Sequence, residues 1–175
     1  MAESFSKAVK RSVGIISANT NGSISTLSNT ITGISTAGIA IGDYILNANY
    51  RIGAKISSIG VGLVTVTENS FNTGYAAGQQ IDISRPVAVL SANEKNIIIG
   101  GTLANLTNTQ VAASVVVSTG ITDVMLLADV PVPPGSSVVI SDAGKTVLGA
   151  GDTVSVFTDT NSALDVNFSF LTGVN

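Results

Sequence analysis

The clearest alternation of hydrophobic and polar positions lies near the end of the 175-residue chain, in the stretch ALDVNFSFL. Four apolar side chains alternate there with three polar ones: Leu164, Val166, Phe168 and Phe170 with Asp165, Asn167 and Ser169. Because successive side chains of a strand point to opposite faces, this pattern predicts a strand with one buried and one solvated face.

Similar runs fill the chain from residue 97 onward, separated by turn residues. They are NIIIGGTLANLT, QVAASVVVST, DVMLLADVPVPP and SSVVISDAGKTVLGAGDTVSVFTD. The prolines of VPVPPGSS remove backbone donors and predict a stiff connection between two strands. Several short strands at this spacing predict an antiparallel β-sandwich over residues 97–175.

Residues 13–84 consist mainly of Thr, Ile, Val and Ser with frequent glycines, which disfavours helices. The segment AKISSIGVGLVTVTENS predicts a hairpin around Gly60 and Gly62. Short strands with few aromatic residues predict a small β-barrel-like module. Its expected interior residues are Ile39, Ile41, Ile45, Ile56, Ile59, Val64 and Val66. Charged residues and Pro86 interrupt the pattern at 85–96, where we expect a linker.

The first twelve residues have a different pattern. Phe5, Ala8 and Val9 stand at helical spacing, with Lys7, Lys10 and Arg11 between them. We expect a short helix or a basic arm over residues 1–12. It is either a flexible, solvated terminus or an arm that docks on an acidic partner surface.

The same small device occurs twice, as AIGD at residues 40–43 and as GAGD at 149–152. In both, glycine supplies an unusual backbone angle and aspartate can bond nearby amides. We expect each to be a turn that opens a strand in a separate module, with neither aspartate doing chemistry.

Composition limits the function further. Only 11% of the residues are charged and 45% are hydrophobic, yet no apolar run approaches the roughly 20 residues of a membrane-spanning segment. So few charges favour assembly with other subunits. The charge is also uneven: residues 96–175 carry six aspartates and a single basic residue, Lys145.

The chain has no cysteine and no histidine, which removes triads, thiol nucleophiles and imidazole metal sites. Gly144-Lys145-Thr146 resembles the end of a phosphate-binding loop, but Val139 stands where the first glycine is needed. The C-terminal aspartates have no calcium-loop spacing. We therefore expect no enzyme, no cofactor and no metal site.

Binding functions are judged by charge and aromatic residues. The sequence pI near 4.6, without a basic stripe, predicts no nucleic-acid binding; Arg51, Lys55 and Arg85 look isolated. Carbohydrate binding needs only a shallow platform of aromatic and amide groups. The candidate glycan contacts are Tyr44, Tyr50 and Tyr75, with Phe71 beside them in the same module.

Two long stretches carry a resemblance to known proteins. They are GISTAGIAIGDYILNANYRIGAKISSIGVGLVTVTENS and VPVPPGSSVVISDAGKTVLGAGDTVSVFTDTNSALDVNFSFL. The first is similar to a module of tail-fibre and virion-surface proteins, and the second resembles a C-terminal β domain of phage proteins. Both thus resemble virion structural proteins of tailed bacteriophages, in particular marine cyanophages and their relatives. Together they cover roughly half of the chain.

The resemblance implies a virion subunit present in many copies, located on the capsid, neck or tail and acting as a homo-oligomer. A capsid decoration protein that clamps neighbouring subunits of the major capsid protein is the leading hypothesis, and a trimer would suit a threefold capsid site. A neck, tail or baseplate subunit, or a receptor- or glycan-binding virion module, is the alternative.

Overall fold

The computed structural model describes residues 3–71, 76–140 and 145–173, and all regular structure in these ranges is β-strand. The strands are antiparallel and form two separately packed units. Residues 1–14 and 87–175 make the C-terminal unit, and residues 15–86 make the N-terminal unit. The expected all-β class is therefore confirmed.

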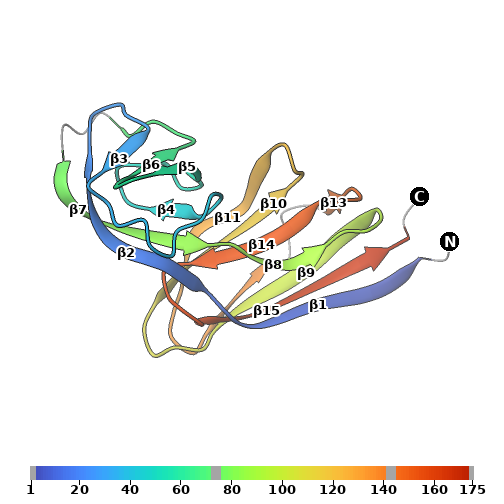
Figure 1. The fold of residues 1–175 in the computed structure, drawn as a ribbon. Coiled ribbons are helices and arrows are strands. Elements are labelled where there is room, and N and C mark those ends of the chain that lie inside the picture. Colours follow the sequence, from blue (N-terminus) through green and yellow to red (C-terminus); the bar gives the residue numbers. More distant parts are fainter. Residues whose placement is uncertain (1–2, 72–75, 141–144, 174–175) are drawn as a thin grey trace. The chain divides into compact units, whose positions relative to one another are not determined.

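The C-terminal unit is a sandwich of two sheets (Figure 1). The five-stranded sheet has the order β1-β15-β9-β12, with β13 also paired to β9, and the four-stranded sheet has the order β11-β10-β14-β8. The strands are β1 Ser4–Val13, β8 Val87–Ser91, β9 Asn96–Asn105, β10 Val111–Ser118, β11 Asp123–Val132, β12 Ser137–Ile140, β13 Thr146–Leu148, β14 Thr153–Thr158 and β15 Leu164–Thr172.

The sandwich core combines side chains from both sheets. Leu103, Val166 and Phe168 of the five-stranded sheet share one buried cluster with Val115 and Val154 of the other. The alternation predicted for the last strand is confirmed, since its four apolar residues are buried and Asn167 and Ser169 are exposed. The sequence thus reports the buried face of β15 directly.

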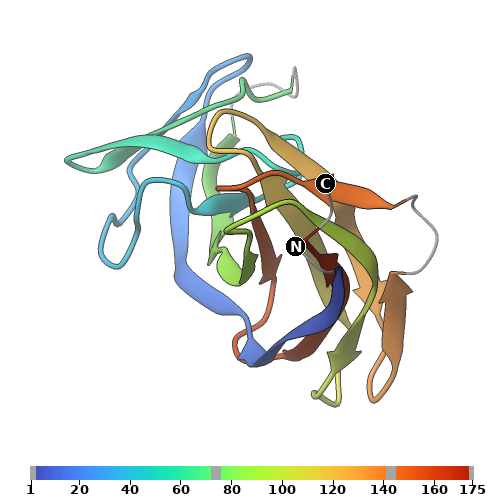
Figure 2. The ribbon, with the colours of Figure 1, turned by 90° about the vertical axis from the view of Figure 1, so that its right-hand side faces the viewer.

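The expectation of a separate N-terminal arm is corrected. Residues 4–13 form strand β1, which pairs with β15 from Ser4 opposite Thr172 to Val13 opposite Leu164. Figure 2 shows the two strands side by side from a second direction. β1 is an edge strand with nine of its ten residues incompletely buried, so its sequence lacks the alternation that identifies a strand.

The N-terminal unit contains a six-stranded sheet of order β4-β7-β2-β3-β6-β5. The strands are β2 Ile15–Ile24, β3 Thr30–Thr32, β4 Tyr44–Leu46, β5 Ile56–Gly60, β6 Leu63–Val66 and β7 Ala76–Arg85. Backbone bonds also join its two end strands: Gly42 donates to Ile56 and Ile45 donates to Ala54, both at 2.9 Å. The hydrogen-bonded path therefore returns to its first strand, as in a small barrel.

Most of the interior expected for this module is confirmed. Ile45, Ile56, Val64 and Val66 are buried, and Ile39 packs against their cluster. The hairpin at Gly60 and Gly62 is β5–β6, with Gly62 at φ 66° in its turn. Two of the expected interior residues, Ile41 and Ile59, are instead exposed. Ile41 lies in a turn, and a β-bulge between Ile56 and Ser58 breaks the alternation before Ile59.

The linker expected at residues 85–96 is also corrected. β7 continues to Arg85, β8 begins at Val87, and only Pro86 separates the two strands. β8 pairs with β14 and belongs to the sandwich, so the part of the sandwich that follows the N-terminal unit begins ten residues earlier than expected. Proline marks the change of unit because it cannot donate to a continuing ladder.

Candidate functional site

The two Gly-Asp stretches form the same turn in the two units. In the first, Asp43 donates its amide to the Ala40 carbonyl at 3.1 Å, and its Oδ2 accepts the Ala40 amide at 2.9 Å. In the second, Asp152 and Gly149 make the equivalent bonds at 3.2 and 2.7 Å.

The intervening glycines of the two turns have almost equal positive φ angles, 92° for Gly42 and 93° for Gly151. This backbone region is one that glycine adopts without strain. β4 starts directly after Asp43 and β14 directly after Asp152. Each device thus opens a strand in its own unit, as the sequence predicts, although the carboxylate bonds the amide three residues before it.

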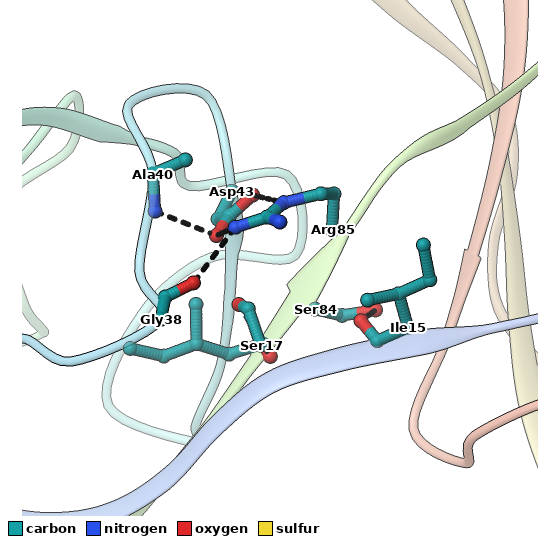
Figure 3. A network of polar contacts seen from close by, with 8 residues as sticks. Ile15, Ser17, Gly38, Ala40, Asp43, Ser84 and Arg85 are labelled. Atoms are coloured by element: carbon teal, nitrogen blue, oxygen red, sulfur yellow. Dashed lines mark hydrogen bonds and ion pairs between the residues drawn. The ribbon is translucent and has the colours of Figure 1, made fainter.

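The first turn carries an additional ion pair (Figure 3). Arg85, at the end of β7, donates Nε to Asp43 Oδ1 and Nη2 to Asp43 Oδ2, each at 3.0 Å. Its Nη2 also donates to the Gly38 carbonyl at 2.8 Å. The Asp43 side chain is only 2% exposed, whereas that of Arg85 is 38% exposed. Arg85, which the sequence analysis places outside any basic stripe, is thus paired with a carboxylate of its own unit.

The chemistry of this cluster is that of a clamp. A bidentate guanidinium–carboxylate pair fixes both position and orientation. The hydrogen bond to Asp43 raises the pKa of Arg85 above its ordinary value, so the guanidinium keeps its charge. Every carboxylate oxygen of Asp43 accepts a bond from within the unit. The pair holds the 38–43 turn against the end of β7.

The expected glycan-binding platform is contradicted by the burial of two of its tyrosines. Tyr44 is 2% exposed and Tyr50 is 3% exposed, and their rings lie inside the N-terminal unit. The Tyr50 hydroxyl donates to the Ser28 carbonyl at 3.2 Å, and Lys55 Nζ lies 6.0 Å from the centre of the Tyr44 ring. A buried ring offers no face for a sugar to stack on. Tyr75, the third candidate, lies outside the described residues.

The burial of Tyr50 should make the stability of the N-terminal unit sensitive to alkaline pH. Burial raises the pKa of Tyr50 from 10.0 to about 12. A folded-state pKa above the unfolded value means that the stabilisation is complete below pH 10 and is lost as the pH rises from 10 to about 12. Urea unfolding at several pH values should show this loss, and Tyr50→Phe should remove most of it. The Ser28 carbonyl still accepts the Ser70 amide in that variant. An unchanged pH dependence in Tyr50→Phe would contradict the assignment.

The three basic residues of the expected docking arm are all on β1, but Lys7 stands opposite the exposed Ser169 and Lys10 opposite the buried Val166, so these two lysines belong to different faces of the strand. Lys7, Lys10 and Arg11 are all exposed, and Arg11 Nε is 3.4 Å from Asp165 Oδ2. They stand on an edge strand of a sheet. A deletion of residues 2–11 would therefore remove a strand from the sandwich and leave β15 as the new edge.

The outward face of the five-stranded sheet is a feature that the sequence analysis missed. We define this outer face by two rows of residues that stand opposite one another on successive strands. The first row is Phe5, Leu171, Ile97 and Val147, and the second is Val9, Asn167, Thr102 and Val139. Between them lie Lys7, Ser169 and Gly100.

The outer face exposes apolar side chains, whereas the solvated face of a sheet normally carries polar ones. Phe5 is 83% exposed, Val139 62%, Val9 56% and Val147 53%. Ile99, displaced by a β-bulge in β9, adds a further exposed side chain. Its apolar residues lie on strands far apart in sequence, which is why no local pattern reveals the face. Contiguous exposed apolar surface marks interaction sites.

Other kinds of site find little support. No group of three Asp or Glu side chains that could hold a metal ion occurs within residues 3–71, 76–140 and 145–173. The same ranges contain no helix long and apolar enough to span a membrane. Of the loop-like Gly144-Lys145-Thr146, Gly144 lies outside the described residues and Thr146 opens the short strand β13.

Comparison with known proteins adds no relative. No family model, no curated protein sequence and no solved structure matches the chain.

Proposed function

We propose that this chain is a non-enzymatic structural subunit of a tailed-bacteriophage virion, and that it acts as a capsid decoration protein. The single observation that carries the proposal is the outer face, an apolar surface with few charges in a chain rich in paired strands. Function then resides in surfaces rather than in a catalytic centre. The two phage-like stretches of the sequence supply the setting.

The mechanism proposed is clamping by many weak contacts. A standard interface buries about 1,600 Å² in total. Repetition of the subunit over a symmetric particle turns modest single affinities into strong collective attachment. The partners are then the major capsid protein or other virion subunits, and the chain works as a homo-oligomer. The basic residues of β1 would meet an acidic strip on the partner.

Purified virions of the phage that encodes the chain provide the direct test. We expect mass spectrometry to detect the chain in the particles and cryo-EM reconstruction to show its density at symmetric positions over the head. Density confined to the neck, tail or baseplate would favour a structural subunit of those parts. Absence of the chain from every part of the particle would overturn the proposal.

Charge reversal tests the role of the basic residues of β1 without removing the strand. Lys7→Glu/Lys10→Glu should weaken attachment to particles at least about tenfold, with the largest difference at low salt, because attraction to an acidic strip becomes repulsion. Arg51→Glu is the control, a charge reversal at an exposed arginine of the N-terminal unit. Occupancy of particles, measured by sedimentation and gel densitometry, reports the result. Equal effects of the two variants would rule out a specific role for β1.

A further inference from the structure

The outer face is self-complementary. Across the sheet the first row runs Phe5, Leu171, Ile97, Val147, so an apolar residue stands at every position. The second row runs from Val9 through Asn167 and Thr102 to Val139, with apolar ends and a polar middle. When either row is laid on its own reversed copy, apolar end residues meet apolar ones. In the second row the Asn167 amide also meets the Thr102 hydroxyl.

We propose that a second copy of this chain covers the outer face, with the two five-stranded sheets stacked about a twofold axis parallel to the strands. This axis places Phe5 of one copy over Val147 of the other and Leu171 over Ile97. In the second row Val9 meets Val139, and the Asn167 amide lies near the Thr102 hydroxyl, to which it can donate. Sheets stack in this way about 10 Å apart with strands nearly aligned.

The order of the rows selects this axis over the other twofold arrangement. Rotation about an axis perpendicular to the strands would lay the first row on the second, so that the apolar Leu171 would meet the polar Asn167. It would also lay β1 on β1 and bring Lys7 of the two copies together, and like charges at close range cost free energy. The parallel axis instead lays each row on its own reversed copy, so the second copy is received in one orientation.

The area of the face agrees with a modest dimer. Four strands at a spacing of about 4.8 Å and the eight β1 residues in register with β15, at about 3.3 Å each, give the sheet a surface of about 19 by 26 Å, or about 500 Å², that contains the two rows. Two such faces bury on the order of 1,000 Å², near the lower limit for a specific interface. We therefore expect reversible dimers with micromolar dissociation constants. A second copy and a capsid subunit would compete for the outer face, so the inference concerns the isolated chain and does not rest on the proposed virion function.

Sedimentation equilibrium of the full chain tests the pairing. We expect a concentration-dependent mass that approaches twice 17.6 kDa. Val147→Lys should raise the dissociation constant at least about tenfold, because each dimer buries two of the new charges. Val124→Lys is the matched control: Val124 is also 53% exposed, but it lies on β11 in the other sheet. If circular dichroism shows that Val147→Lys is unfolded, Val139→Lys takes its place.

Cysteine cross-linking tests the orientation, since the natural chain contains no cysteine. Phe5 and Val147 of one chain are three strand spacings apart, about 14 Å, whereas the stacked sheets place Phe5 of one copy about 10 Å from Val147 of the other. A bifunctional thiol reagent that spans about 10 Å should therefore link Phe5→Cys/Val147→Cys into covalent dimers. A double variant of Phe5→Cys/Val124→Cys should give few. A monomeric wild type, a trimer unaffected by Val147→Lys, equal sensitivity to Val124→Lys, or a dimer without the cross-link would each overturn the proposal.

Discussion

Replacing Phe168 with Ala is expected to lower the free energy of unfolding of the C-terminal unit by about 4 kcal/mol. The side chain is 0% exposed and belongs to the core shared by the two sheets. Its ring packs over Gly101 on the adjacent strand so closely that a Cβ at that position would lie 2.6 Å from ring carbon Cδ1. Because the glycine has no side chain to move into the space, truncation of the ring leaves a cavity.

Urea unfolding followed by hydrogen exchange in peptides of the C-terminal unit measures this loss. Phe5→Ala is the control, because Phe5 lies on the neighbouring strand of the same sheet but is 83% exposed. At protein concentrations low enough to keep the chain monomeric, Phe5→Ala should change stability by less than about 0.5 kcal/mol. Similar losses in the two variants would show that the ring of Phe168 is not packed as described.

The sequence predicts local structure well where a strand has one buried face. β15 and the β5–β6 hairpin follow from alternation and glycine placement within a few residues. β1 does not, because its pairing partner lies more than 150 residues away and its own side chains are mostly exposed. Nothing within residues 1–12 distinguishes an exposed edge strand from a flexible terminus.

The features of the candidate site also divide into local ones, which the sequence predicts, and non-local ones, which it does not. Both Gly-Asp turns are local, because each is closed by a bond between an aspartate carboxylate and the amide three residues before it. Their geometry therefore follows from the glycine and the aspartate of each stretch. The contact between Arg85 and Asp43 spans 42 residues and depends on how β4 pairs with β7. Burial of Tyr44 is equally non-local, since β4 places its ring inside the unit. Residue type alone marks tyrosine as a candidate contact but cannot report its exposure.

Replacement of Arg85 by Ala should cost the N-terminal unit about 3 kcal/mol. The variant leaves the buried Asp43 carboxylate with the Ala40 amide as its remaining bond among those described here, and removes the donor from the Gly38 carbonyl. Loss of one partner of a buried pair costs about 3–5 kcal/mol, and the 38% exposure of the Arg85 side chain places this site near the lower end because water can reach the carboxylate. Arg85→Lys should recover only part of the loss, since an ammonium cannot bind both oxygens in the same plane.

The second Gly-Asp turn supplies an internal comparison for the clamp. Asp152 makes the same backbone bonds as Asp43 but no guanidinium bond is described for it, so Asp152→Ala should cost only about 1 kcal/mol, the worth of a single turn hydrogen bond. Arg51→Ala, an exposed arginine of the N-terminal unit, should leave stability unchanged. Urea unfolding with hydrogen exchange in residues 38–46 and 81–85 would measure the two arginine variants, and exchange in residues 149–158 would measure Asp152→Ala. If Arg85→Ala cost no more than Arg51→Ala, the ion pair would not hold the turn, and β4 would owe its position to the backbone bonds between the ends of the sheet.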